Sequence, residues 1–240
     1  MPNAPEHVPG RGFLHEGGIR NMNKTKTRTL TLAAMFAALA YLVMLIGRLP
    51  IMPTLSFLKY DPKDVIIAVA GFLLGPLQGL AITAAVSLLE MITVSETGFI
   101  GLAMNILSTG AFMLPAAGIY RRNRSMRGAV TGLILGVVCM AVVMLAWNYI
   151  ITPLYMHAPR ETVAGMLLPV FLPFNLLKGT LNAAITMLLY KPLVQSLRSL
   201  RLVPEDKLRP DKGRSFSIWV TLVCVFVIAT VIVCFRLIGK

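Results

Sequence analysis

A polar stripe inside an apolar stretch is the strongest sign of binding chemistry in this sequence. The segment "PFNLLKGTLNA" at residues 173–183 contains Asn175, Lys178 and Asn182, and their spacing places them on one face of a helix. A lysine in the middle of a membrane helix costs about 2.5–3.5 kcal/mol, so its ammonium needs protein, water or a ligand as a partner. The stripe therefore predicts a binding pocket, the alternative being that Lys178 reaches the membrane surface.

Two further segments supply groups that suit a pocket. "AWNYIITPLY" at 146–155 places Asn148 among aromatic residues that are typical of a membrane interface. "LPIMPTLSFLKYDPKD" at 49–64 is too apolar and too rich in proline for a plain solvated connection. We expect this loop to fold over the pocket as a lid, although a loop lying on the membrane surface has the same composition.

The elements that position these residues are those of an all-α integral membrane protein. The chain is 56% hydrophobic and 14% charged, with a mean hydropathy of +0.74. Several apolar stretches reach the roughly 18 to 20 residues that a bilayer-spanning helix requires, and none alternates as a barrel strand does. The stretches lie near 30–46, 65–92, 99–119, 129–151, 166–190 and 217–235.

The apolar run at 64–92 predicts two short helices. A single helix of that length would exceed a hydrocarbon core of about 30 Å, and Gly75-Pro76 disfavours helical geometry. With the split, 16 of the 23 basic residues face one side of the membrane and 4 face the other. This asymmetry agrees with the positive-inside rule. The sequence thus predicts a multi-pass cell-membrane protein whose six-helix core has both ends in the cytoplasm.

Four regions follow from these patterns. Residues 1–23 are rich in Pro and Gly and predict a disordered tail, and residues 24–198 form the six-helix core. Residues 199–216 are a basic linker. Residues 217–238 predict an additional C-terminal transmembrane helix, because 19 uncharged residues run from Ser217 to Phe235.

Other classes of function find little support. The chain has no GxxxxGK[ST], HExxH or GxSxG motif, so an enzyme is not expected, although a membrane-embedded enzyme acting on a lipid-like substrate remains the alternative. The basic residues flank membrane segments, which argues against nucleic acid binding. The three histidines lack metal-ligand spacing, and Cys139, Cys224 and Cys234 lie in apolar stretches as packing residues.

Six motifs together resemble a known family. In chain order they are "TLAAMFAALA", "FLKYDPKD", "GFLLGPLQG", "NILSTGAFMLPAAGIYRR", "WNYIITPLY" and "LPFNLLKGTLNA". Over about residues 28–198 the chain resembles the substrate-binding S component of energy-coupling factor (ECF) transporters, specifically the RibU-type riboflavin family. The resemblance implies a six-helix S-component bundle that binds riboflavin from outside as a transported ligand and uses no cofactor.

The resemblance also implies partners and site residues. Uptake would require a transmembrane coupling protein and two ABC-type ATPases, all within membrane lipid. The family pattern places polar ligand contacts at Asn148, Asn175 and Lys178. Apolar contacts from the lid are expected at Leu55, Phe57, Leu58 and Tyr60. An S component for another vitamin or for a flavin nucleotide is the closest alternative.

Small residues in the first helix suggest a docking surface. Ala33, Ala34, Ala37 and Ala38 give two overlapping small-xxx-small pairs, which allow another helix to approach closely in lipid. By the resemblance this motif contacts the coupling protein. The alternative is that the alanines pack within this chain.

Overall fold

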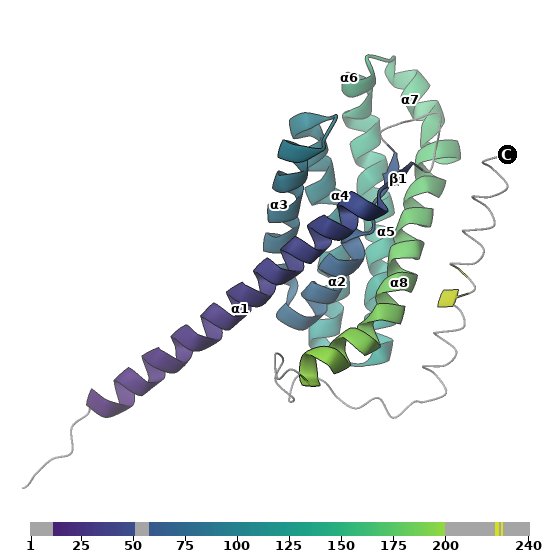
Figure 1. Ribbon diagram of the computed structural model, residues 1–240. Helices are drawn as coiled ribbons and strands as arrows, with labels where there is room; N and C mark the ends of the chain where they lie inside the picture. The colour runs from purple at the N-terminus through teal and green to yellow at the C-terminus, as the bar shows by residue number, and fades with distance from the viewer. Residues whose placement is uncertain (1–11, 51–57, 200–223, 226, 228–240) are drawn as a thin grey trace, which may run out of the picture.

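A computed structural model describes residues 12–50, 58–199, 224, 225 and 227. Long helices form a bundle, and short elements gather at one end of it (Figure 1). The long helices are α1 (Gly12–Gly47), α2 (Lys63–Leu74), α3 (Pro76–Thr93), α4 (Gly98–Arg122), α5 (Met126–Ile150) and α8 (Leu172–Ser199). The short elements are the strands β1 (Leu49–Pro50) and β2 (Lys59–Tyr60), the helices α6 (Thr152–Met156) and α7 (Arg160–Met166), and the π-helical turn η1 (Leu167–Phe171).

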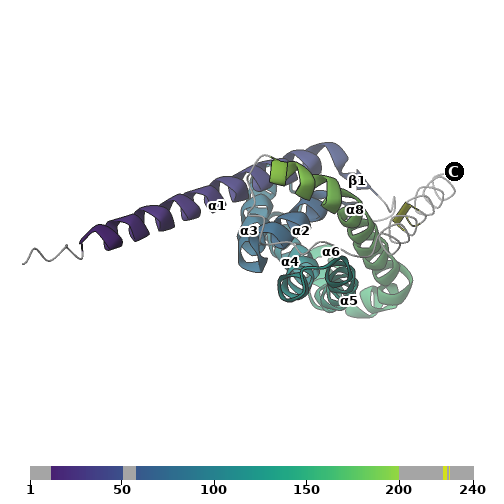
Figure 2. The same cartoon turned by 90° about the horizontal axis from the view of Figure 1, so that it is seen from below.

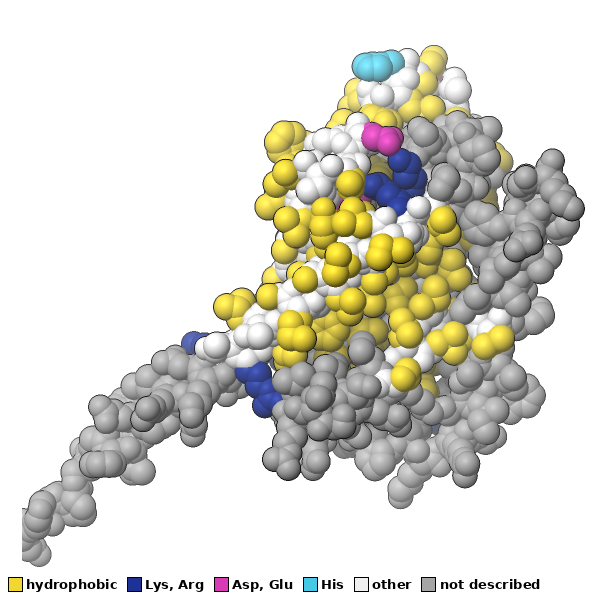
Figure 3. All heavy atoms as spheres, viewed as in Figure 1, with side chains coloured by type: hydrophobic (Ala, Val, Ile, Leu, Met, Phe, Trp, Pro, Cys, Tyr) yellow, Lys and Arg dark blue, Asp and Glu magenta, His cyan; other side chains and the backbone are white. Residues whose placement is uncertain are grey.

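The bundle has the lengths and surface of a membrane protein. Within the described residues, five helical segments are long and apolar enough to cross a bilayer: Lys26–Gly47, Pro76–Thr93, Gly98–Arg122, Met126–Met156 and Arg160–Tyr190. Apolar side chains cover the flank seen in Figure 3, and the Lys and Arg side chains visible there lie towards its two ends. The all-α membrane architecture predicted from the sequence is therefore confirmed.

Helix α2 is short because it is enclosed by protein. Its 12 residues rise only about 18 Å at 1.5 Å per residue, and all of Lys63 to Leu73 are buried. It packs against α1, α3, α4 and α8, and the view from below shows it inside their circle (Figure 2). A helix buried on every side can carry charged residues that lipid would not accept, which matters for the site.

The break between α2 and α3 is the one predicted from Gly75-Pro76. Gly75 has φ 106° and ψ 165°, a conformation that only glycine adopts without strain, and its N–H donates to the Gly71 carbonyl at 2.9 Å. Pro76 takes the first helical position of α3, where its missing N–H costs nothing. The split that underlies the six-helix topology is thus confirmed.

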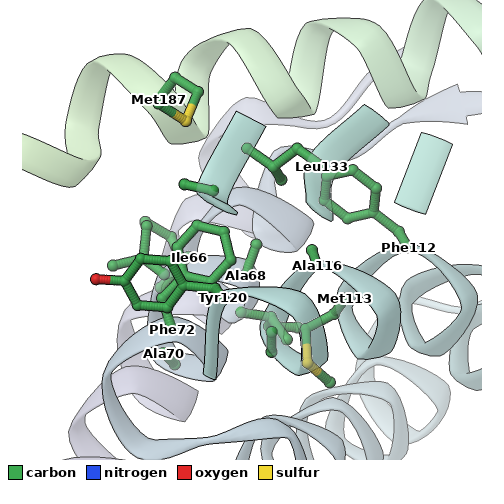
Figure 4. Close-up of a cluster of buried hydrophobic side chains, with 14 of the residues drawn as sticks. Ile66, Ala68, Ala70, Phe72, Phe112, Met113, Ala116, Tyr120, Leu133 and Met187 are labelled. Atoms are coloured by element: carbon green, nitrogen blue, oxygen red, sulfur yellow. The ribbon is translucent and has the colours of Figure 1, made fainter. Parts of the chain in front are cut away.

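The core between α2, α4, α5 and α8 fixes how these helices sit against one another. Figure 4 shows Ile66, Phe72 and Tyr120 packed together, Phe112 of α4 beside Leu133 of α5, and Met187 on α8, all members of one buried cluster. Close approach of α4 and α5 depends on small residues. A Cβ added at Gly136 would lie 2.3 Å from the Phe112 carbonyl oxygen, so any larger residue would push the two helices apart.

At the N-terminal end the structure differs from the prediction, and the predictions for the C-terminal end fall almost wholly outside the described residues. A disordered tail is predicted over residues 1–23, whereas α1 begins at Gly12 and its first turns project away from the bundle (Figure 1). All prolines of that tail precede Gly12, and a helix once formed extends at little cost per residue. Residues 1–11, residues 200–216 of the predicted linker 199–216, and the predicted span 217–238 lie outside the described residues, except for 224, 225 and 227.

Candidate functional site

A pocket opens at the end of the bundle where the hairpin strands lie. It contains about 480 Å³ of empty space, including the part open to the outside. Side chains from the end of α1, the hairpin, α4, α5 and α8 line it: Arg48, Leu58, Lys59, Asp61, Met104, Asn105, Ser108, Met144, Asn148, Phe174, Asn175 and Lys178. The three principal residues predicted from the sequence, Asn148, Asn175 and Lys178, all belong to this lining.

Asn148 and Asn175 present amide groups from two helices. The Oδ1 atom of Asn148, in the last turn of α5, accepts a hydrogen bond from Thr152 Oγ1 at 2.9 Å. Its Nδ2 atom is buried without a partner among the described residues. Asn175 Nδ2 donates to the Phe171 carbonyl at 2.7 Å, which fixes the amide and leaves its oxygen as an acceptor. A buried unpaired donor is costly, so Asn148 is suited to a ligand that brings an acceptor.

Lys178 is held inside the protein. The path from Arg160 to Ser199 is helical throughout, so Lys178 lies well within the span and not at its outer boundary. Its side chain is 8% exposed and its Nζ atom lies 3.3 Å from Asp64 Oδ2, at the buried start of α2. Lys178 therefore combines a place in the pocket wall with a buried counter-charge, and the membrane-surface alternative is wrong.

A second group of charges lies between the hairpin and α3. Lys63 is fully buried, and its Nζ atom lies 2.5 Å from Glu90 Oε2 and also contacts the Asp61 carboxylate. Arg48 Nη2 completes the group at 3.1 Å from Glu90 Oε1. Burial acts to raise the pKa of the Asp61 carboxyl, but the Lys63 and Lys178 ammonium groups hold it below its ordinary value. The base of the hairpin is thus fixed by a network of paired charges.

Replacing Lys63 with methionine is expected to lower the free energy of unfolding by about 3 kcal/mol, because two buried carboxylates lose their shared cation. Denaturant unfolding in detergent measures this. Lys59→Met is the matched control, since Lys59 pairs at 2.8 Å with Glu96, which is largely exposed. Exposed ion pairs contribute little. Equal stability losses in the two variants would contradict the structural role of Lys63.

The structure gives a different result for each of the lid residues predicted from the sequence. Leu55 and Phe57 lie outside the described residues, and Leu58 lines the pocket. Tyr60 is buried but does not line it, and packs instead with Leu181 of α8. Lys59, the other residue of β2, lines the pocket. Contact of Tyr60 with a ligand therefore stays a prediction, which the lining of this pocket does not support.

The four alanines of the α1 motif form two pairs that face different sides of the helix. Ala33 and Ala37 pack against the hydrophobic core, as the internal-packing alternative predicts. Ala34 and Ala38 lie on the exposed face, beside Met35 and Leu39, which are 55% and 41% exposed. Helical periodicity separates the two pairs by about 100°. The outer pair is the more accessible of the two to another protein.

Several lining residues were not predicted from the sequence. Arg48, Asp61, Met104 and Met144 had no pattern that distinguished them from loop or packing residues. Asn105 and Ser108 also line the pocket, and their i, i+3 spacing on α4 is the same kind of signal as the stripe on α8.

Comparison with known proteins places the chain among transport proteins. Residues 28–190 match the family described as "ECF transporter, substrate-specific component". Riboflavin transporter FmnP of Bacillus subtilis (strain 168) is 29% identical over 189 residues, which are 74% of this chain and 99% of that protein. Riboflavin transporter RibU of Staphylococcus aureus (strain TCH60) is 30% identical over 190 residues, which are 76% of this chain and 99% of that protein.

A solved structure gives the same result for the fold. The structure described as "Structure and mechanism of the S component of a bacterial ECF transporter" superposes with a TM-score of 0.62 at 30% identity. The match covers 72% of this chain and 99% of that chain. The chain therefore belongs to the family of ECF transporter substrate-specific components, which are membrane transport subunits and not enzymes.

Proposed function

We propose that this chain captures riboflavin in the pocket at the hairpin end and delivers it to the cytoplasm. The observation that carries the proposal is the convergence of Asn148, Asn175 and Lys178 on one pocket, in a chain whose relatives are named riboflavin transporters. Three polar groups that converge on one pocket fit recognition of one small molecule.

The walls of the pocket match the two chemical faces of a flavin. Met104, Met144, Phe174 and Leu58 offer apolar and aromatic surface to the flat isoalloxazine ring. The carbonyl and imide edge of the ring, together with the ribityl hydroxyls, needs donors and acceptors. These groups are supplied by the side-chain amide of Asn148, the side-chain oxygen of Asn175 and the ammonium of Lys178.

Delivery requires energy that this chain does not supply. In the proposed cycle the pocket faces the outside, both ends of the six-helix core are cytoplasmic, and the lid loop covers the bound vitamin. A transmembrane coupling protein and two ABC-type ATPases drive reorientation in the membrane. The coupling protein docks on the exposed pair Ala34 and Ala38, where small side chains permit close helix packing.

The charges around the pocket favour a neutral ligand. The described cations that line it are Arg48, Lys59 and Lys178, and each lies within 4 Å of an acidic side chain. The lining acid Asp61 is paired in turn with Lys63. A phosphate carries a charge of about −1.5 to −2 and would have to displace one of these acidic partners.

We therefore expect riboflavin to bind at least about 10-fold more tightly than flavin mononucleotide, which corresponds to roughly 1.4 kcal/mol. Calorimetric titration of the detergent-purified protein with riboflavin, flavin mononucleotide and thiamine measures both the ligand and the selectivity. Failure of riboflavin to bind, or preferential binding of thiamine, would overturn the proposed function. Tighter binding of the nucleotide would overturn the charge argument alone.

A further inference from the structure

The carboxylate of Asp64 lies directly behind the pocket wall. Asp64 is completely buried in the first turn of α2 and is not part of the lining, whereas Lys178, which contacts it, is. The helix N-terminus favours a negative charge at this position. Asp64 therefore cannot touch a ligand in the pocket itself, and any effect on binding must pass through its neighbours.

Both carboxylate oxygens are held by groups from other helices. Oδ1 accepts a hydrogen bond from Thr109 Oγ1 of α4 at 2.6 Å. Oδ2 accepts one from Asn182 Nδ2 of α8 at 3.2 Å and also lies 3.3 Å from Lys178 Nζ. A carboxylate fixed from α4 and α8, on a helix buried on all sides, has little freedom to move.

A fixed carboxylate constrains the position and direction of the lysine ammonium. An ammonium has three donors on a flexible four-carbon stem, and one donor directed at Asp64 leaves two for the pocket. Asp64 is the acidic side chain within 4 Å of Lys178 Nζ among the described residues. The nearby Asp61 carboxylate is instead in contact with Lys63.

We propose that Asp64 is a positioning residue for ligand binding, which holds the Lys178 ammonium in place and directed into the pocket. The proposal rests on the proposed function, because riboflavin is the ligand used to test it. Asn182 belongs to the same arrangement: the third member of the polar stripe on α8 contacts Asp64 and is not part of the pocket lining. Two of the stripe residues thus serve the pocket directly and the third serves it through the carboxylate.

The test is a double-mutant cycle between Asp64 and Lys178, read out by quenching of riboflavin fluorescence on binding. Asp64→Asn keeps the shape of the side chain and removes its charge. We expect it to weaken riboflavin binding about 10-fold when Lys178 is present and less than about 2-fold in a Lys178→Met background. Asp64→Glu, which keeps the charge, should recover part of the affinity.

Equal losses of affinity in the two backgrounds would show that Asp64 acts only on the fold and would overturn the proposal. Unchanged affinity in the single variant Asp64→Asn would overturn it as well. If Asp64→Asn does not fold, Thr109→Val replaces it, since that change keeps the carboxylate and removes its shortest hydrogen bond. It should weaken binding about 3-fold only in the presence of Lys178. Unchanged affinity in Thr109→Val would also count against the proposal.

The matched control is Ser87→Ala. Ser87 lies on α3, outside the pocket lining, and its buried hydroxyl has no partner among the described residues. Its affinity should equal that of the parent chain. Failure of the proposed function is recognised separately, because the parent chain itself would then not bind riboflavin. Loss of binding in Lys178→Met with additive behaviour of Asp64→Asn would overturn the positioning role alone.

Discussion

Replacing Lys178 with methionine is expected to weaken riboflavin binding about 100-fold, because a hydrogen bond from a charged donor contributes about 1.5–3 kcal/mol and each 1.4 kcal/mol is a factor of ten. Methionine keeps most of the apolar stem, so the change removes the ammonium and little packing. Titration by flavin fluorescence in detergent measures the dissociation constant, and thermal unfolding of the same sample shows whether the bundle is intact.

The control for this variant is Thr186→Val. Thr186 is buried on α8, donates to the Asn182 carbonyl at 2.7 Å and does not line the pocket, so its replacement tests the general cost of a polar change in this helix. We expect the control to bind riboflavin as the parent chain does. A Lys178→Met protein with parental affinity would remove the lysine from the site, and an equal loss in both variants would assign the effect to folding.

Replacing Ala38 with tryptophan is expected to leave riboflavin binding unchanged and to lower riboflavin uptake at least about 10-fold, because overpacking a close helix contact costs about 1–3 kcal/mol. Ala38 lies on the exposed face of α1, so a larger side chain meets no residue of the described bundle core. Uptake is measured in cells that cannot make riboflavin and that carry the energy-coupling partners, alongside titration of the purified variant.

Ala146→Trp provides the comparison for this second result. Ala146 is also an exposed alanine, but it lies on α5, which is not among the helices that pack against α1. Both variants place the same side chain on the outer surface of the bundle, and only the first is on the proposed docking face. Normal uptake by Ala38→Trp would contradict the docking assignment, and equal impairment in both would indicate a general effect of the tryptophan in the membrane.

The two results would separate capture of the vitamin from its delivery. Lys178 lies in the pocket wall and Ala38 on the outside of α1. A loss of affinity in one variant and a loss of uptake alone in the other would show that binding does not depend on the coupling protein. This is the behaviour expected of a subunit that recognises its ligand and leaves the energy input to its partners.

Local features of the sequence were sufficient for the main elements and for part of the site. Gly75-Pro76 breaks the helix because of the backbone geometry of those two residues, wherever the segment lies in the fold. The spacing of Asn175 and Lys178 places them on one side of any helix that contains them. The length and apolarity of the other stretches likewise predict spans, because they depend on the thickness of the bilayer.

Only the tertiary structure decided which of these groups meet. Asp64 and Asn182 are 118 positions apart and belong to helices whose relative rotation is set by the packing of the whole bundle. The same holds for the contact of Lys63 with Glu90, for the turn of Ala34 and Ala38 towards the outside, and for the packing of Tyr60 against Leu181. The sequence by itself determined which residues share a helical face. The direction of each face depends on contacts among all the helices, so no single segment contains that information.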